Sequence, residues 1–184
     1  THASMPIGAY SEKQIMPEEK LVSVPDGVSD EVASCITLKG ITAEYLLHRA
    51  YPLKKGDKVL YHAAAGALGQ ILCPWANALG AEVIGTVGSK AKEEIAKKNG
   101  CHHVINYSEK DFVKEVEKIF GKNSLDVVYD GVGSKTFKGS IETLKIRGMM
   151  VAFGNASGYV ETLDIKKDIN AKGLFFTRPS IAHY

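Results

Sequence analysis

Short apolar runs alternate with amphipathic stretches along the chain from residue 59 onward. The runs VLYHAAA, AEVIGTV, HHVIN, LDVVYD, MMVAFG and GLFFTR are rich in Val, Ile and Phe, which favour strands. They predict strands at 59–65, 81–87, 102–106, 125–130, 149–154 and 173–178. The stretches between them predict helices near 67–79, 89–99, 110–120, 135–147 and 164–171.

Turn residues mark most of the predicted helix ends. Gly100, Gly121 and Gly148 follow the last turns, where a glycine readily ends a helix. Ser108 or Ser134 can cap the start of the following helix. Continuous apolar strands, each followed by a helix, require a parallel sheet that is covered on both faces. The pattern therefore predicts an α/β fold with a doubly wound parallel sheet of six strands.

Residues 1–58 have a different pattern. They contain Pro6, Pro17 and Pro25 in the first thirty residues, a possible strand at 10–15 and one helix over about 29–50. The first thirty residues cannot form a core alone. We therefore expect residues 1–35 to be the remnant of a neighbouring domain, and residues 36–184 to form the domain that carries the function.

Composition excludes two classes of partner. With 45% hydrophobic and 24% charged residues, the 184-residue chain has the balance of a globular protein. No apolar run reaches the roughly 18 residues that span a bilayer, so we expect no membrane segment. The 23 basic and 21 acidic side chains leave a net charge of only +2, with no basic block. We therefore expect no nucleic-acid partner.

The cysteines and histidines predict neither disulfides nor a metal site. Cys35, Cys73 and Cys101 are odd in number, widely spaced and outside any CxxC pattern, which favours the reducing cytosol, a cytoplasmic location. His102 and His103 are adjacent, and adjacent residues on a strand point to opposite faces. We expect one ring inside the fold and the other outside.

Small side chains occupy the passage from the strand at 59–65 into the next helix. The sequence VLYHAAAGALGQ contains Ala64, Gly66 and Gly69 in the pattern A-x-G-x-x-G. A helix N-terminus exposes unpaired N–H groups and a partial positive charge, and small residues let a phosphate reach them. Gly66 would permit close approach of the phosphates, and Gly69 close helix–strand packing. Small residues also occur where a helix merely crosses a sheet closely, but the βαβ context favours a dinucleotide site.

The end of the second strand indicates which dinucleotide binds. NAD sites place an acidic residue there, and its charge would repel the 2′-phosphate of NADP(H). Residues 84–92 read IGTVGSKAK and contain no acid. Ser89 offers a hydroxyl, and Lys90 and Lys92 offer ammonium groups near a helix start, which suit a phosphate dianion. NADP(H) is the predicted cofactor, although either lysine could instead pair with a neighbouring glutamate on an exposed helix.

Four further residues carry structural expectations. Pro74 lies about two turns into a predicted helix and removes one hydrogen bond, so we expect a kink or an early bend there. Tyr61, Trp75 and Phe175 are expected to pack in the core rather than to form a cofactor site.

Several strings of residues resemble one family. HAAAGALGQ, ANALGAEVIGTVGS, HHVINY, DVVYDGVG, GMMVAFGNASG and FFTRPS are similar to the NADPH-dependent, zeta-crystallin-like quinone oxidoreductases of the medium-chain dehydrogenase/reductase superfamily. The resemblance covers nearly the whole chain. Members of that family are considerably longer and begin with most of a GroES-like catalytic domain. The resemblance thus implies that residues 1–35 are a remnant of that domain and that residues 36–184 are the NADP(H)-binding Rossmann domain.

The resemblance also implies which residues bind the cofactor. The nicotinamide end is assigned to Thr42, Phe153, Gly154 and Asn155, the pyrophosphate turn to Ala65, Gly66, Ala67, Leu68 and Gly69, and the adenosine with its 2′-phosphate to Gly88, Ser89, Lys92 and Tyr107. Two positions depart from the family. Gly131, also expected near the cofactor, stands where a serine is common, and Leu68 stands at a usual valine position. Tyr107 has a structural alternative as a half-buried aromatic at a strand end.

The resemblance implies a reaction without zinc and without a catalytic side chain. The family passes reducing equivalents from NADPH to a quinone or another small electrophilic acceptor, and the cofactor carries the chemistry. No catalytic triad, paired carboxylates or activated cysteine suggest another reaction. Asp130 is expected to organise the loop that follows it. Two alternatives stay open: an enoyl- or alkenal-type reductase of the same superfamily, and a non-catalytic NADPH-binding module.

The C-terminal predicted strand carries an expectation about assembly. The sequence GLFFTRPS is apolar and lies at an edge of the predicted sheet, where an uncovered strand would be a pairing hazard. The family resemblance implies a homodimer through this edge.

Overall fold

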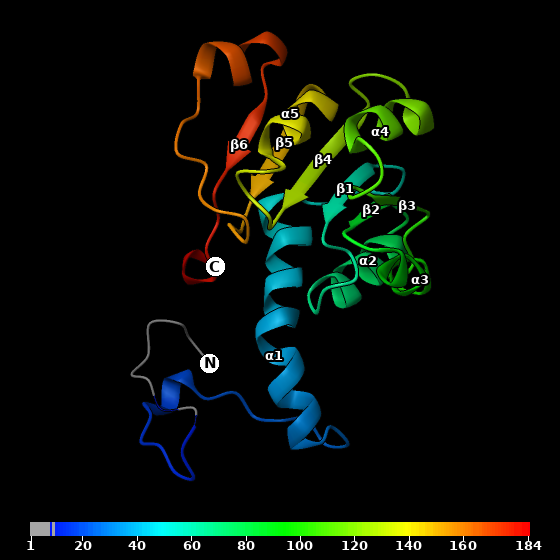
Figure 1. Ribbon diagram of the computed structural model, residues 1–184. Helices are drawn as coiled ribbons and strands as arrows, with labels where there is room; N and C mark the ends of the chain where they lie inside the picture. The colour runs from blue at the N-terminus through cyan, green and yellow to red at the C-terminus, as the bar shows by residue number, and fades with distance from the viewer. Residues whose placement is uncertain (1–7, 9) are drawn as a thin grey trace.

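A single parallel sheet organises the protein. The computed structural model describes residue 8 and residues 10–184. Its six strands lie in the order β3-β2-β1-β4-β5-β6, and all neighbours are parallel. Helices α2 and α3 cover one face and α4 and α5 the other (Figure 1). This is the strand order of a doubly wound Rossmann fold, so the predicted fold class is confirmed.

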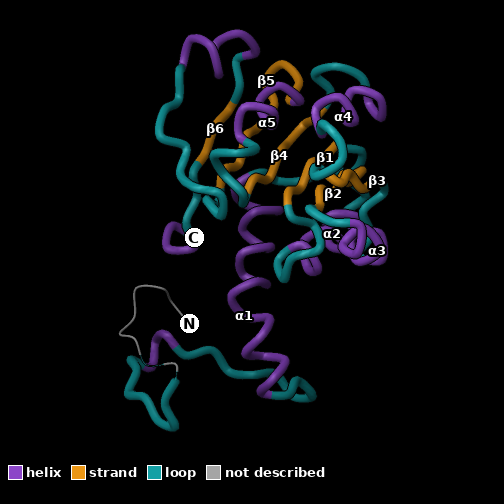
Figure 2. Tube along the Cα trace, viewed as in Figure 1, coloured by secondary structure: helices purple, strands orange, loops and turns teal. Residues whose placement is uncertain are grey.

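The elements follow the predicted alternation (Figure 2). The strands are β1 (Lys58–His62), β2 (Glu82–Val87), β3 (His103–Asn106), β4 (Leu125–Asp130), β5 (Leu144–Ala152) and β6 (Phe175–Thr177). The α-helices are α1 (Asp30–Glu44), α2 (Gly69–Ala78), α3 (Lys90–Lys98), α4 (Phe112–Phe120) and α5 (Phe137–Thr143). Short π-helical turns are η2 (Tyr45–Ala50) and η3 (Ile165–Ile169), and 3-10 turns are η1 (Glu18–Lys20), η4 (Asn170–Lys172) and η5 (Ile181–His183).

Two buried clusters lie on opposite faces of the sheet. Along β1, Val59 and Tyr61 enter the cluster under α2, and Leu60 enters the cluster under α4 and α5. Successive side chains on a strand point to opposite faces, so a strand buried on both faces needs an unbroken apolar run. This requirement explains why the strands were recognisable in the sequence. It also confirms the core placement of Tyr61, which is 3% exposed.

The predicted strand at 10–15 is absent. These residues form bends and irregular chain, and Tyr10 and Ile15 are fully exposed. A strand needs a neighbouring strand for its hydrogen bonds, and this segment lies away from the sheet (Figure 1). The predicted boundary between residues 35 and 36 falls inside α1, and the division into two domains stays a prediction.

The prediction of a helix to residue 147 is wrong. Helix α5 ends at Thr143, and β5 begins at Leu144, which pairs with Leu125. The register then shifts, and Arg147 adopts a φ of 61°. This irregularity interrupts the period-2 pattern that would have revealed the early strand. Gly148 consequently lies within β5 and does not cap a helix.

Several helix ends also differ from the predictions. Asp111 caps α4 and accepts from the Val113 amide at 3.0 Å, whereas Ser108 donates to the Gly88 carbonyl at 2.8 Å. Ser134 donates to a loop carbonyl and caps no helix either. A side chain can cap only where the chain turns, and sequence spacing alone does not locate that turn.

Other expectations have mixed outcomes. Gly100 and Gly121 do follow α3 and α4, with φ of 81° and 88°. The helix expected at 164–171 consists instead of η3 and η4, and α2 continues through Pro74 to Ala78. Trp75 is half-buried against the core as expected.

Residues on the two edge strands are more exposed than expected. Phe175 in β6 is 47% exposed, so its core placement was wrong. His102 and His103 do not divide into one buried and one exposed ring, because His102 precedes β3 and its ring accepts from the Val83 amide at 3.0 Å, and His103, the first residue of β3, packs against the Phe120 ring. His102 is exposed and His103 only partly buried.

Among the described residues, no helix has the length and apolar character to cross a bilayer.

Gly85 in β2 tests this packing. A Cβ there would lie 2.6 Å from both the Cβ of Ala64 and the Sγ of Cys101. We expect Gly85→Ala to lower the free energy of unfolding by about 1–3 kcal/mol through overpacking. The control is Gly40→Ala in α1, where nothing lies within 4 Å of the added methyl group. It should raise stability by about 0.5–1 kcal/mol. Equal guanidinium midpoints for the two variants would contradict this account of the packing.

Candidate functional site

The turn between β1 and α2 leaves backbone amides unpaired. Ala63 reverses the chain with a φ of 62°, and the Ala64 amide donates to the Thr86 carbonyl at 2.9 Å. Within the described part of the chain, the amides of Ala65, Ala67 and Leu68 donate to no protein acceptor. These N–H groups stand at the N-terminus of α2, where the helix dipole is positive. The turn can therefore receive an anion such as a diphosphate.

Gly69 allows the helix to begin this close to the strand. A Cβ on Gly69 would lie 2.3 Å from the Ala64 carbonyl oxygen, a distance that no side chain tolerates. Gly69 thus provides the close helix–strand packing expected of it. Gly66 is exposed, and a Cβ there would lie 3.1 Å from the Ala63 carbonyl oxygen, so a side chain would also crowd the turn.

Residues expected at the adenosine end come together beyond β2 and β3. Ser89 precedes α3, and its side chain makes no capping hydrogen bond. Lys92 is exposed and forms no ion pair within the described residues. The Tyr107 hydroxyl lies against Gly88, since a Cβ on that glycine would be 2.8 Å from it. Glu93, the nearest acid along the chain, accepts from an asparagine of β3 at 3.2 Å. A hydroxyl, an ammonium and a phenol thus remain available at this end.

A cavity of about 520 Å³ lies beside the turn, on the side of Ala63 and Tyr107. Ala63 of the turn and Tyr107 line it, together with the apolar Phe112 and Val132. Lys135 adds a positive charge. Sequence reasoning missed the last three residues, because they belong to loops and helices that only the fold brings to this position.

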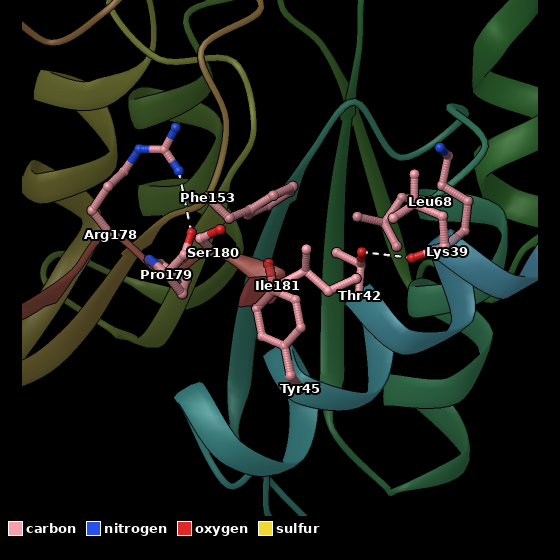
Figure 3. Close-up of a pocket in the computed structure, with 10 residues that line it drawn as sticks. Lys39, Thr42, Tyr45, Leu68, Phe153, Arg178, Pro179, Ser180 and Ile181 are labelled. Atoms are coloured by element: carbon pink, nitrogen blue, oxygen red, sulfur yellow. Dashed lines mark hydrogen bonds between the residues drawn. The ribbon is translucent and has the colours of Figure 1, made fainter. Parts of the chain in front are cut away.

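A second cavity, of about 580 Å³, lies on the other side of the turn (Figure 3). It brings together three residues of the predicted nicotinamide end and turn, which are Thr42, Leu68 and Phe153. The Thr42 hydroxyl donates to a carbonyl one helical turn earlier, at 2.7 Å. The lining residues that the sequence did not predict are Leu38, Lys39, Tyr45, Arg178, Pro179, Ser180 and Ile181. The spacing of Lys39, three residues before Thr42 on a helix, was an available signal.

Gly131, Gly154 and Asn155 line neither cavity. A Cβ on Gly154 would lie 2.4 Å from the Gly131 carbonyl oxygen, and a Cβ on Gly131 would lie 2.8 Å from the Phe153 ring. The two glycines therefore pack the ends of β4 and β5 together. The serine common in the family at position 131 would collide with the present position of Phe153.

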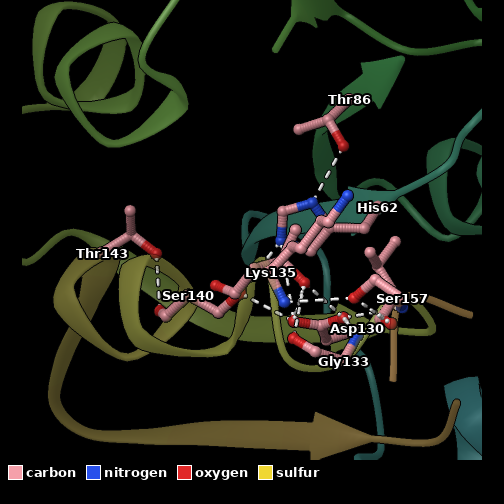
Figure 4. Close-up of polar contacts among 10 residues, drawn as sticks. His62, Thr86, Asp130, Gly133, Lys135, Ser140, Thr143 and Ser157 are labelled. Atoms are coloured by element: carbon pink, nitrogen blue, oxygen red, sulfur yellow. Dashed lines mark hydrogen bonds and ion pairs between the residues drawn. The ribbon is translucent and has the colours of Figure 1, made fainter. Parts of the chain in front are cut away.

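A buried polar network holds the ends of β1 and β4 (Figure 4). Asp130 accepts from the amides of Val132 and Gly133 at 2.8 and 3.0 Å, which confirms that it organises its loop. Ser140 of α5 donates to the same carboxylate at 3.0 Å, and its oxygen lies 2.9 Å from Nε2 of His62. The network thus links α5 with both strands that border the crevice.

The contacts of His62 favour one tautomer. The hydroxyl of Ser140 lies within hydrogen-bond distance of the Asp130 carboxylate, which can only accept, and if it donates there, Nε2 of His62 carries the hydrogen and donates to Ser140. Nδ1 then accepts from Thr86, 2.8 Å away. Burial lowers the pKa of His62, and the nearby Asp130 opposes this only in part. The ring is therefore neutral and cannot act as a general acid.

Comparison with known proteins places the chain in a family. The sequence profile of a family described as zinc-binding dehydrogenase matches residues 67–184. A 2-haloacrylate reductase from a Burkholderia species is 48% identical over 182 residues, which cover 97% of this chain and 55% of that protein. Quinone oxidoreductase 1 of Escherichia coli K12 is 44% identical over 184 residues, 100% of this chain and 56% of that protein.

A solved structure agrees with these sequence relatives. The crystal structure of Escherichia coli quinone oxidoreductase complexed with NADPH is similar, with a TM-score of 0.85 and 44% identity. The match covers 89% of this chain and 50% of that chain. The chain thus spans about half the length of these relatives.

The fold and the open turn define a Rossmann dinucleotide-binding domain. The chain belongs to the zinc-binding dehydrogenase family. Its residues do not fit the zinc of the family's description. Within residues 8 and 10–184, no three His, Cys, Asp or Glu side chains gather as a metal site.

The buried state of His62 generates a pH prediction. Above its ordinary pKa of 6.5, the ring is neutral both in the folded and in the unfolded chain. Below that pH only the unfolded chain takes up the proton, so stability falls by up to about 1.4 kcal/mol per pH unit. We expect His62→Asn to be less stable at neutral pH but to lack this component of the pH dependence. Urea unfolding of both proteins between about pH 5 and pH 7.5 measures it. Parallel pH profiles would contradict the neutral buried ring.

Proposed function

We propose that the chain is the NADPH-binding portion of an oxidoreductase that transfers reducing equivalents from NADPH to a quinone. The observation that carries the proposal is the turn before α2, where the amides of Ala67 and Leu68 have no acceptor among the described residues and Gly69 brings the helix against the strand. The 44% identity to an Escherichia coli quinone oxidoreductase solved with NADPH supports it.

The two cavities suit the two halves of a dinucleotide. Ala63, at one end of the turn, lines the cavity with Tyr107, and Leu68, at the other end, lines the cavity with Thr42. A molecule that occupies both cavities must cross the turn between them. In this proposal the diphosphate lies on the free amides, the adenine lies beside Phe112, and the nicotinamide lies in the cavity of Thr42 and Phe153.

The 2′-phosphate is assigned to Ser89, Lys92 and Tyr107. The uncapped hydroxyl of Ser89, the unpaired ammonium of Lys92 and the phenol beside Gly88 supply hydrogen bonds and charge. These groups favour the phosphate of NADPH over the bare ribose hydroxyl of NADH, and the tip of β2 has no carboxylate to repel that phosphate. Gly131 and Gly154 pack beside Phe153 at the nicotinamide end, and Asn155 stays assigned to the same end of the cofactor.

When bound, the cofactor would supply the hydride, and the protein would bind the cofactor and orient its nicotinamide. The hydrogen bond from Thr42 to the backbone holds its hydroxyl on the face of α1 that looks into the cavity. The ring of Phe153 and the side chain of Leu68 exclude water from the same space. The proposal assigns no nucleophile or general acid to this chain.

Reduction of an activated carbon–carbon double bond is a second candidate function. The 48% identity to a 2-haloacrylate reductase favours it. Assay of NADPH oxidation with a quinone and with an unsaturated acid separates the two functions. A protein that binds NADPH and reduces neither acceptor would be a non-catalytic module.

We also propose that the protein is a cytoplasmic homodimer. In support, β6 ends the strand order, and its Phe175 and Phe176 are 47% and 38% exposed. An apolar edge of this kind invites pairing with a second copy. The free thiols of all three cysteines are compatible with a reducing compartment.

The cofactor assignment predicts a difference between two lysines of α3. Lys92→Gln should weaken NADPH binding by about 5- to 10-fold, because one charge-assisted bond to the 2′-phosphate is lost. NADH binding should stay the same. The control is Lys98→Gln, which removes an exposed charge from the end of the same helix and should change neither affinity. Fluorescence titration measures both dissociation constants. Equal affinity of the unsubstituted protein for NADPH and NADH would contradict the assignment.

The dimer proposal predicts the effect of a charge on β6. Phe175→Glu should convert the dimer into a monomer, because two like charges would face each other across the paired edges. Ile95→Glu, at a position on α3 that is 41% exposed, should leave the dimer intact. Light scattering coupled to size exclusion measures the mass of each variant. A monomeric unsubstituted protein at high concentration would exclude the proposed dimer.

A further inference from the structure

One arginine in the cavity of Thr42 and Phe153 has no acidic partner in the part of the chain that the structure describes. The chain has three arginines. Arg49 pairs with Glu44 at 3.1 Å, and Arg147 lies over the Phe175 ring at 5.3 Å. Arg178, which directly follows β6, forms no ion pair within the described residues. Its guanidinium donates to the neighbouring Pro179 carbonyl, at 3.3 Å.

Arg178 lies at the end of the cavity that is remote from the diphosphate turn. Figure 3 shows Phe153 between Arg178 and Leu68, and Leu68 belongs to that turn. Lys39, the other cation of the cavity, lies beside Leu68. A cofactor diphosphate on the turn is therefore close to Lys39 and separated from Arg178. Arg178 is an exposed residue of the cavity lining, on the side of Phe153 away from Leu68, and we place the acceptor at this end.

The chemistry of this end suits a small anion with an apolar body. Phe153, Tyr45 and Ile181 form apolar walls of the cavity. A guanidinium offers a planar pair of N–H donors that matches the two oxygens of a carboxylate. A neutral quinone would use the walls and leave this charge unpaired.

We propose that Arg178 is a specificity-determining residue that binds a carboxylate on the acceptor. The acceptor class is then a small electrophile with a carboxylate close to its reducible double bond. This inference rests on the second candidate function above, the reduction of an activated carbon–carbon double bond, and it needs the nicotinamide in the same cavity. A guanidinium binds any anionic group, so a phosphate of the cofactor is a second source of such a group. The experiment below separates the acceptor carboxylate from the cofactor phosphate.

The test is a pair of titrations on the chain loaded with NADP⁺, which cannot deliver a hydride. The probes are 2-chloropropionate and its neutral isostere 2-chloropropionamide, at constant ionic strength, followed by NMR chemical shifts. We expect the carboxylate to bind about 5-fold more tightly than the amide. Arg178→Gln should abolish this preference without changing the affinity for NADP⁺. Arg178→Lys should retain part of the preference, because the charge stays and the donor fork is lost.

Two other variants test which positive charge binds the cofactor and which binds the carboxylate. Lys39→Gln should weaken NADP⁺ binding and keep the preference for the carboxylate. Lys166→Gln, an exposed charge outside both cavities, should change neither.

The outcomes distinguish this inference from the proposed function. Loss of NADP⁺ affinity in Arg178→Gln, with the carboxylate preference intact, would assign the guanidinium to the cofactor and overturn the inference. Equal binding of the two probes to the NADP⁺-loaded chain, or no measurable binding of either, would also overturn it and leave the proposed function standing. Failure of NADP⁺ itself to bind would contradict the proposed function.

Discussion

The site depends on the contact between the start of α2 and the end of β1. Gly69 lies so close to Ala64 that a single added carbon would be 2.3 Å from its carbonyl oxygen, and Gly85 of β2 packs against the same alanine from the other side. This stack of small residues brings the helix N-terminus directly to the end of the strand. The free amides are therefore presented at the crevice where the strand order reverses, and both cavities open from that point.

The opposite border of the crevice depends on a buried charge. Asp130 is 1% exposed and is compensated by two backbone amides and by the hydroxyls of Thr136 and Ser140. The hydroxyl of Ser140 also contacts His62, so the network extends to the neutral ring of that residue. His62 is the last residue of β1 and stands just before the turn at Ala63. A satisfied buried network of this kind orders its surroundings, because any unpaired member would be costly. The loop at Val132 and the turn at Ala63 consequently face each other across one cavity.

The sequence predicted the structure correctly where a physical requirement restricts the residue types of a short segment. Burial on both faces forces continuous apolar strands, so five of the six were located near their final positions. The small residues Ala64 and Gly69 similarly indicate that a helix and a strand lie close together there. The reasoning failed where the determinant is distant in sequence. The start of β5 depends on pairing of Leu144 with Leu125. The residues Phe112, Lys135 and Arg178 reach the cavities only when the strands and helices have assembled into the complete fold.

A crystal structure of the chain with NADPH tests the central claim most directly. The account predicts diphosphate oxygens within hydrogen-bond distance of the amides of Ala67 and Leu68, with the adenine beside Phe112 and the nicotinamide beside Phe153. Density for the nucleotide at another place on the protein, with these amides covered by protein side chains, would contradict it.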